Sequence, residues 1–325
     1  ARFGARYFFR LRAPFLGRWV CTQGVDGKIT HRDRWKHAFD FEVEDGNGAR
    51  FRGDGSKPQD YLCFRLPVLA PADGTVVRVI DDVEDNRVGE QNLKQNWGNL
   101  VLLYHAPGLY SLVCHLARGS AKVREGQFVR RGEPLGACGS SGRSPVPHLH
   151  FQLQSSPTIG APTVQTELHD VVLEVDGDPQ LIATLVAQEG NTVRNLEPSD
   201  DGIGLPPPDD TELVFDVQRD GAKRTETLVA EVDLLGARIL RSQELNARAY
   251  YEDAGDLFRV FDTSGDRRSV VHLLQAALPT VPYELSDRLR WTDHLELRHL
   301  LPGPARVLLD FVSPFVERSA LLMQY

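Results

Sequence analysis

The chain has 325 residues, of which 41% are hydrophobic, 25% are charged and 8% are aromatic, and its formal net charge is −8. These values exclude a disordered, collagen-like or coiled-coil protein, and the acidic balance argues against a protein that binds nucleic acid through its phosphates. The length predicts two domains, or one large domain with an appendage. The sequence contains no run of about 18 apolar residues, so we expect no transmembrane segment.

The first half of the sequence has the pattern of a β-protein. Short runs of β-branched and aromatic residues, separated by glycine and proline, predict strands in chain order. The predicted strands cover residues 6–11, 37–42, 74–80, 99–104, 110–116 and 148–154. Because long helical periodicity is missing, we predict a mainly β, antiparallel architecture.

Proline, glycine and aspartate concentrate at residues 197–210, which predicts a linker there. We therefore expect one domain at 1–196 and a second, smaller domain at 211–325. Strands at 212–217 and 226–232 and a helix at 268–277 predict an α+β class for the second domain. No motif in the second domain indicates a function.

The segment 147–151, Pro-His-Leu-His-Phe, carries the first chemical signal. On a strand, His148 and His150 point to the same face. Of two imidazoles placed in this way, one can bind a metal while the other contacts water or substrate. A His-x-His pair also arises by chance in alternating strands, so further residues are needed.

Two more residues extend this signal. His115 lies near the end of the strand predicted at 110–116, and Asp40 lies between two phenylalanines in the strand predicted at 37–42. A buried carboxylate needs a partner of opposite charge, unless Asp40 faces the surface of an alternating strand. Histidine and carboxylate ligands with one open position are typical of a catalytic zinc site.

Taken together, these phrases resemble the zinc metallopeptidases of the lysostaphin and LytM type, peptidase family M23. The matching segments are 68–77, 97–105, 135–142 and 147–151, together with the repeated Val-x-x-Gly phrases at 123–132. The resemblance implies an antiparallel β-sheet metallopeptidase domain with zinc as its cofactor.

The resemblance also implies roles for individual residues. Asp40 and His150 match two metal ligands of the family. His115 and His148 match the two histidines that assist catalysis without binding the metal.

The remaining metal ligand departs from the usual family pattern. The common form, His-x-x-x-Asp, would place a histidine at position 36, where this chain has Lys36. His31 and His37 are the two alternatives. An odd offset along a regular strand points His37 away from the face of Asp40, although a bulge would re-aim it. We therefore favour His31, on the loop before the strand.

The function implied by the resemblance is a zinc-dependent endopeptidase that hydrolyses peptide bonds of peptidoglycan stem peptides or cross-bridges with a metal-activated water. The alternative is a catalytically inactive LytM-like regulator that binds and activates other cell-wall hydrolases. The Val-x-x-Gly phrases also resemble carrier domains, but no lysine for modification lies between Val123 and Gly136.

A wall-directed enzyme acts outside the cytoplasm, so we expect a periplasmic or secreted location, with a leader removed from a chain that starts at Ala1. The four cysteines have no Cys-x-x-Cys spacing, which argues against a thiolate zinc cluster. An oxidising compartment favours one or two disulfides among them. Because Cys114 neighbours His115, we expect its side chain to point away from the metal.

Overall fold

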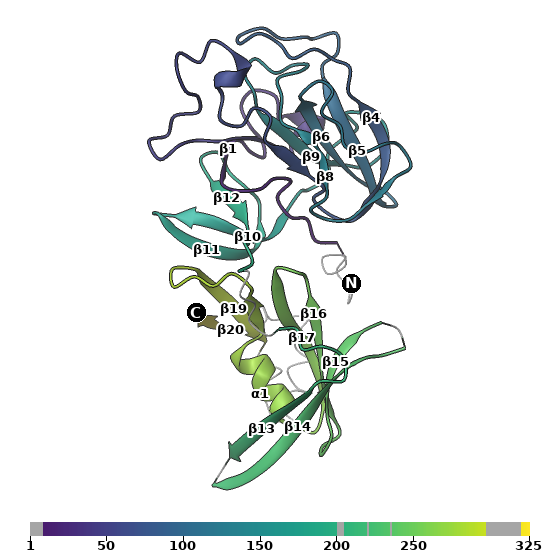
Figure 1. The fold of residues 1–325 in the computed structure, drawn as a ribbon, viewed down its shortest axis with the longest axis vertical. Helices are drawn as coiled ribbons and strands as arrows, with labels where there is room; N and C mark the ends of the chain where they lie inside the picture. The colour runs from purple at the N-terminus through teal and green to yellow at the C-terminus, as the bar shows by residue number, and fades with distance from the viewer. Residues whose placement is uncertain (1–8, 200–204, 220, 235, 297–319) are drawn as a thin grey trace. The chain divides into compact units, whose positions relative to one another are not determined.

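The computed structural model describes residues 9–199, 205–219, 221–234, 236–296 and 320–325 (Figure 1). The chain divides into two compact units, Ala1–Asn195 and Leu196–Tyr325. Antiparallel strands dominate both units, which confirms the predicted mainly β class. No helix in the described part of the chain has the length and apolar character needed to cross a bilayer.

One long sheet organises the N-terminal unit. Its strands are β1 Trp19–Gln23, β2 Ala38–Glu42, β4 Gly74–Ile80, β5 Asn99–Ala106, β6 Leu109–Leu116, β7 Phe128–Val129, β9 Leu149–Gln154, β10 Leu168–Val175, β11 Asp178–Leu185 and β12 Thr192–Asn195. They lie in the order β11-β10-β12-β1-β2-β9-β6-β5-β4-β7. A separate small sheet pairs β3 Pro67–Leu69 with β8 Pro134–Ala137, and two short 3₁₀ helices, η2 Asp33–Trp35 and η3 Pro58–Asp60, lie in the loops.

The strands β2, β4, β5, β6 and β9 lie where the periodicity predicts them, at 37–42, 74–80, 99–104, 110–116 and 148–154. The strand predicted at 6–11 lies mostly outside the described residues, and its described part, 9–11, forms no strand.

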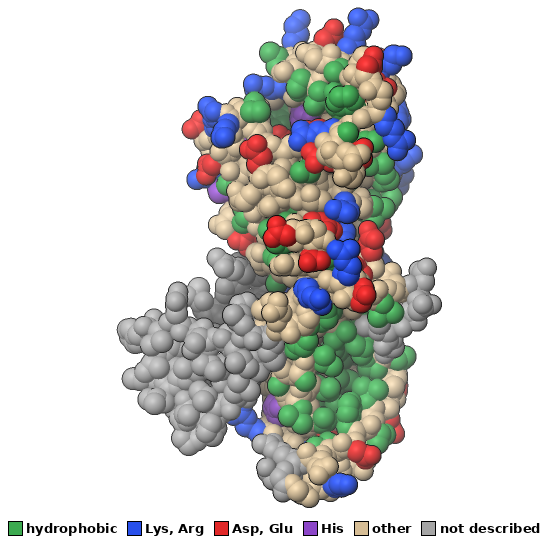
Figure 2. Space-filling view, turned by 90° about the vertical axis from the view of Figure 1, so that its left-hand side faces the viewer, with side chains coloured by type: hydrophobic (Ala, Val, Ile, Leu, Met, Phe, Trp, Pro, Cys, Tyr) green, Lys and Arg blue, Asp and Glu red, His purple; other side chains and the backbone are tan. Residues whose placement is uncertain are grey.

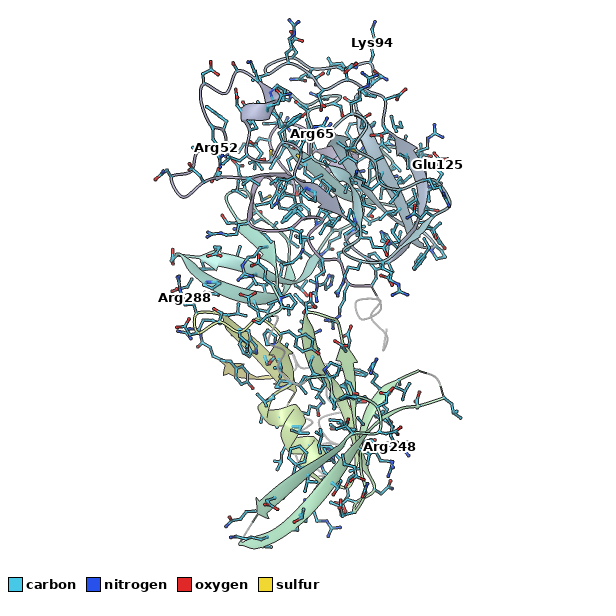
Figure 3. The ribbon with its side chains drawn as sticks, viewed as in Figure 1. Arg52, Arg65, Lys94, Glu125, Arg248 and Arg288 are labelled. Carbon is cyan, nitrogen blue, oxygen red and sulfur yellow. The ribbon has the colours of Figure 1, made fainter. Side chains whose placement is uncertain are left out.

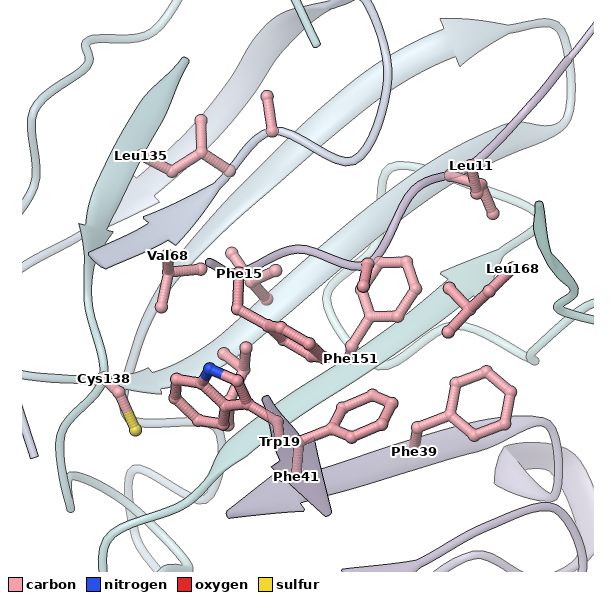
Figure 4. Close-up of a cluster of buried hydrophobic side chains, with 14 of the residues drawn as sticks. Leu11, Phe15, Trp19, Phe39, Phe41, Val68, Leu135, Cys138, Phe151 and Leu168 are labelled. Carbon is pink, nitrogen blue, oxygen red and sulfur yellow. The ribbon is translucent and has the colours of Figure 1, made fainter. Parts of the chain in front are cut away.

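Side-chain alternation gives the N-terminal sheet a strongly apolar face. Phe39 and Phe151 are register partners across β2 and β9, and both are fully buried. They pack with Phe15, Trp19 and Phe41 in the main core (Figure 4). Each large apolar side chain buried in this way contributes about 1.5–3 kcal/mol. Because neighbours along a strand alternate between faces, the residues between these phenylalanines lie on the opposite face of the sheet.

Among the described residues, the C-terminal unit combines a second antiparallel sheet with one helix. Its strands are β13 Glu212–Arg219, β14 Ala222–Val232, β15 Arg238–Ser242, β16 Ala247–Asp253, β17 Leu257–Gly265 and β18 Thr280–Pro282, and they lie in this order. Helix α1 covers Val270–Ala277, and a hairpin pairs β19 Arg290–Glu296 with β20 Ala320–Gln324. The hydroxyl of Ser269 caps α1 by accepting a hydrogen bond from the Val271 N–H.

Charged side chains of both signs are interspersed on the face of the N-terminal unit seen in Figure 2. In the view of Figure 3, the exposed side chains of Arg52, Lys94 and Glu125 also project outward from this unit. On the C-terminal unit, the same view shows hydrophobic side chains gathered over one area. On the face in view, charge is therefore spread over the N-terminal unit rather than collected in one patch.

The expected disulfides are not formed, because Cys21, Cys63, Cys114 and Cys138 are all free and buried. Burial, with a smaller effect of the Asp40 carboxylate, raises the pKa of the Cys21 thiol to about 12. Burial likewise raises the pKa of Cys114 and Cys138 well above the usual range. These three thiols therefore stay protonated at neutral pH, which makes them weak nucleophiles.

Candidate metal centre

Asp40 and His150 lie opposite each other on β2 and β9, on the face turned away from the phenylalanine core. Their side chains are nearly buried, and Nδ1 of His150 lies 2.9 Å from Oδ1 of Asp40. Nε2 of His150 lies 2.9 Å from Oε1 of Gln152, an amide oxygen that can only accept. The Nε2 atom therefore carries the proton of the neutral ring, and Nδ1 presents a lone pair to the carboxylate.

His31 reaches the same carboxylate from the loop between β1 and β2. Its Nδ1 lies 3.0 Å from the carbonyl oxygen of Gly24, to which it must donate. Nε2 of His31 is then unprotonated in the neutral ring. It lies 3.2 Å from Oδ1 of Asp40 and is buried, with no hydrogen-bond partner among the described residues.

His31, Asp40 and His150 each direct one ligand atom into a common space, and these atoms lie within 4.8 Å of one another. Two imidazole lone pairs and a carboxylate repel one another unless a cation lies between them. A set of two nitrogen ligands and one oxygen ligand, with room for a further ligand, suits Zn²⁺. The residues present therefore fit a zinc ion.

His37 does not belong to this group. Its side chain is half-buried just before β2 begins, and its backbone N–H donates to Oγ1 of Thr163. The structure therefore brings His31, and not His37, together with Asp40 and His150.

Asp40 is held by more than the two imidazoles. Nε2 of Gln23 donates to its other oxygen, Oδ2, at 2.8 Å. Burial by itself raises the pKa of the Asp40 carboxyl, but hydrogen bonds and positive charge from the facing imidazoles, His150 first and then His31, outweigh burial and hold this pKa well below its usual range; a cation bound between the three groups would take the place of those protons. Asp40 is therefore ionised at neutral pH and able to act as an anionic ligand.

His115 joins the site through a β-bulge in β6. Leu116 pairs with Asn99 and Cys114 pairs with Leu100, so His115 between them has no partner opposite. Its φ of +61° lies in the left-handed region, which is uncommon for a residue with a side chain. A bulge re-aims side chains, and here it brings the ring of His115 to 4.7 Å, between centroids, from the ring of His148.

Backbone carbonyls orient both His115 and His148. Nδ1 of His115 donates to the Ser141 carbonyl at 2.8 Å, and Nδ1 of His148 donates to the Val146 carbonyl at 3.0 Å. Both rings therefore keep an Nε2 lone pair, and Nε2 of His148 lies 3.9 Å from Oδ1 of Asp40. Burial, followed by the nearby His148 and His150, holds the pKa of His115 well below its usual range, so His115 is neutral at pH 7.

An open pocket surrounds these side chains and has an aromatic wall. The rings of Trp35 and Trp97 meet edge to face at 5.9 Å between centroids, and Trp97 also lies 5.7 Å from the ring of His150. The lining residues are Thr30, His31, Trp35, Asp40, Asn96, Trp97, His115, Arg143, His148 and His150.

Two glycines allow the loops around the pocket to meet. Gly98 has a φ of +59°, and a Cβ there would lie 2.5 Å from the carbonyl carbon of Ser141. A Cβ on Gly142 would lie 2.4 Å from the backbone nitrogen of Gly98. Only glycine permits this approach, which brings the segment with Trp97 against the segment that leads to His148.

Several residues around the site carry no sequence signal of their own. Gln23, Gln152, Asn96, Trp97 and Arg143 reach it from different strands and loops. Trp97 lies within segment 97–105, which resembles the family. The other four residues lie outside the matching segments, and only the fold shows that they are near the site.

The face of Cys114 differs from the expectation. Cys114 is the register partner of His150, and paired residues share a face of the sheet. Its thiol lies in a small buried cluster with Leu100, Leu102 and Leu112. The bulge, and not the strand alternation, therefore determines where His115 points.

Residues 63–159 match the model of peptidase family M23. The cell division protein DipM of Caulobacter vibrioides is 36% identical over 153 residues, which are 45% of this chain and 23% of DipM. The DD-carboxypeptidase/endopeptidase Mpg of Neisseria meningitidis serogroup B is 38% identical over 86 residues, 26% of this chain and 16% of Mpg.

The murein hydrolase activator EnvC of Escherichia coli is 33% identical over 100 residues, 31% of this chain and 23% of EnvC. The chain thus spans less than a quarter of the length of each of these three relatives.

Proposed function

We propose that this chain, whose residues 63–159 match the model of peptidase family M23, is a zinc-dependent endopeptidase that hydrolyses peptide bonds in peptidoglycan stem peptides or cross-bridges. The observation that carries the proposal is the convergence of the His31, Asp40 and His150 ligand atoms within 4.8 Å. The similarity to Mpg, whose name describes a carboxypeptidase and endopeptidase, supports the same reaction class.

In this proposal His31, Asp40 and His150 hold the metal. A zinc ion there would supply a Lewis acid that polarises the scissile carbonyl and lowers the pKa of an attacking water. His115 and His148 move protons, because each presents an Nε2 lone pair while its Nδ1 is held by a carbonyl. An Nε2 atom that accepts a proton from water can then donate it to the leaving amine.

The wall of Trp35 and Trp97 excludes water from one side of the pocket and offers an apolar surface to the peptide. The ring of Trp97 also packs against His150, which keeps that imidazole in its rotamer. Fixed ligands of this kind need no reorganisation when substrate binds, which is a general requirement of efficient catalysis.

A second candidate function is a catalytically inactive regulator that activates other wall hydrolases. The similarity to EnvC, whose name describes a murein hydrolase activator, favours it. The arrangement of His31, Asp40, His150, His115 and His148 argues for the enzyme, because a purely binding surface needs neither the ligand set nor the oriented proton acceptors.

The deciding experiment compares zinc-loaded, chelator-treated and zinc-restored protein on purified peptidoglycan, with products identified by mass spectrometry. We expect new amino termini with the zinc-loaded and zinc-restored forms and none after chelation. Replacement of His150 by alanine should abolish both zinc binding and cleavage. A wild-type protein that holds zinc and releases no product would overturn the endopeptidase and favour the regulator.

We also propose that the activity resides in residues 1–196, that 197–210 is a linker, and that the protein acts outside the cytoplasm on the wall. Limited proteolysis of the full chain tests the linker, because a protease should cut first within 197–210. If the released N-terminal fragment has no zinc-dependent activity, residues 211–325 are required for activity and the proposal fails.

A further inference from the structure

Arg143 is the one lysine or arginine among the residues that line the pocket. Its side chain is exposed, while its backbone N–H donates to the Asn96 carbonyl at 2.8 Å. The neighbouring Ser140 and Ser144 are fully buried. An exposed guanidinium group thus extends from a backbone position that the surrounding structure holds in place.

The one carboxylate that lines the pocket does not pair with Arg143. Asp40 is the one carboxylate among the lining residues, and His31 and His150 surround it. Within the described residues, no carboxylate forms an ion pair with Arg143. The guanidinium group therefore remains available for a ligand at the mouth of the site.

We propose that Arg143 binds a carboxylate of the peptide substrate beside the scissile bond, an inference that rests on the proposed peptidase function. A guanidinium group offers two parallel N–H donors that match the two oxygens of a carboxylate. The rings of Trp35 and Trp97 contact the apolar part of the peptide. Because the guanidinium group binds its carboxylate, the pocket selects an acidic peptide rather than a neutral one.

A carboxylate fits better than a phosphate-rich ligand. Polyanions such as nucleic acids bind through many cations at once, and this pocket offers a single one. The paired rings of Trp35 and Trp97 supply an apolar surface next to that charge. One cation beside apolar surface matches a peptide that carries an isolated acidic group.

The experiment uses one cross-linked muropeptide dimer in two forms, with its free carboxyl groups intact and with these groups converted to carboxamides. Cleavage of each form by the zinc-loaded full chain gives a ratio of kcat/KM values. Isothermal titration calorimetry with chelator-treated protein gives the affinity for each form without hydrolysis. We expect the wild type to prefer the carboxylate form by roughly tenfold or more, as for a hydrogen bond to a charged group.

Three variants make the test specific. In Arg143→Gln, cleavage of the carboxylate form alone should slow, so the preference should be lost. Arg143→Lys should keep part of the preference, because lysine retains the positive charge but lacks the two parallel N–H donors of the guanidinium group. Arg34→Gln is the matched control, because Arg34 lies over the Trp35 ring, 5.6 Å from its centroid, but does not line the pocket. The control should keep the wild-type preference.

Equal cleavage and equal binding of the two forms by the wild type would overturn the role of Arg143 and leave the peptidase intact. A loss of rate in Arg143→Gln that is equal for both forms would also overturn it. Discrimination in binding with no cleavage by the zinc-loaded protein would support Arg143 and overturn the endopeptidase. Neither binding nor cleavage of either form would overturn both.

Discussion

Gln23 and Asp40 are register partners across β1 and β2, and the Gln23 amide connects two parts of the candidate metal centre. Its Nε2 donates to Oδ2 of Asp40 at 2.8 Å, while its Oε1 accepts hydrogen bonds from the backbone N–H groups of Ile29 and Thr30. A Cβ on Gly27 would lie 2.3 Å from the Gln23 side chain, so the glycine makes room for it. One glutamine therefore orients the carboxylate and holds the loop that carries His31.

Replacement of Gln23 by alanine should weaken zinc binding by about 10–100-fold, the usual effect of removing a residue that orients metal ligands. Competition with a chromophoric chelator measures this affinity. Gln218→Ala, at an exposed position of β13, is the control and should bind zinc like the wild type. An unchanged affinity in Gln23→Ala would show that Asp40 and His31 need no such support.

Replacement of His31 and replacement of His37 should have opposite effects on the zinc content of the protein. Because Nε2 of His31 lies 3.2 Å from Oδ1 of Asp40 while His37 lies outside the group, His31→Ala should lose zinc and His37→Ala should keep it. Metal analysis of the purified variants by mass spectrometry decides between them. Zinc loss in His37→Ala alone would reverse our assignment.

Replacement of His115 by asparagine should leave zinc bound and slow cleavage by about 10²–10⁴-fold, as expected for a residue that transfers protons. Asparagine is the right substitution because it tolerates the positive φ at this bulge better than most residues do. The measurement pairs zinc content with kcat, and His37→Asn is the control. A variant that keeps its zinc and its full rate would exclude a catalytic role for His115.

The hydrogen bonds of Glu226 should make the start of α1, in the C-terminal unit, sensitive to acid. Its buried carboxylate accepts hydrogen bonds from Arg224 at 2.9 Å, from the Val270 N–H at 3.0 Å and from the Ser269 hydroxyl, which fixes the start of α1. Burial raises the pKa of Glu226, but the hydrogen bonds from Ser269, Arg224 and Val270 outweigh burial and lower it below 4.5.

Because the folded-state pKa is depressed, the unfolded chain takes up this proton first as the pH falls. The stabilisation is therefore complete above pH 4.5 and is lost as the pH falls through the folded-state pKa. Glu226→Gln should destabilise α1 by about 1–3 kcal/mol at pH 7 and less at lower pH. Hydrogen exchange of the α1 amides measures this, with Glu231→Gln, from an ion pair open to solvent, as the control. A difference between wild type and Glu226→Gln that is constant with pH would contradict the mechanism.

The sequence alone determined five strands of the N-terminal sheet, β2, β4, β5, β6 and β9, and it indicated the histidines and the aspartate of the candidate site. Alternation along β2 and β9 depends only on neighbouring residues, so a period of two places Asp40 and its neighbouring phenylalanines on opposite faces of the sheet. The same periodicity placed His148 and His150 on one face. The family resemblance then related these residues to His115, which is distant in the sequence.

Only the tertiary structure decided how the remaining groups meet. The approach of His31 to Asp40 depends on a loop held by Gln23, and the direction of His115 depends on a bulge opposite β5. Spacing along one segment cannot predict either, because both result from register between strands and from packing of distant loops. The place of Arg143 on the pocket has the same origin, since the backbone contact with Asn96 brings together two loops far apart in the chain.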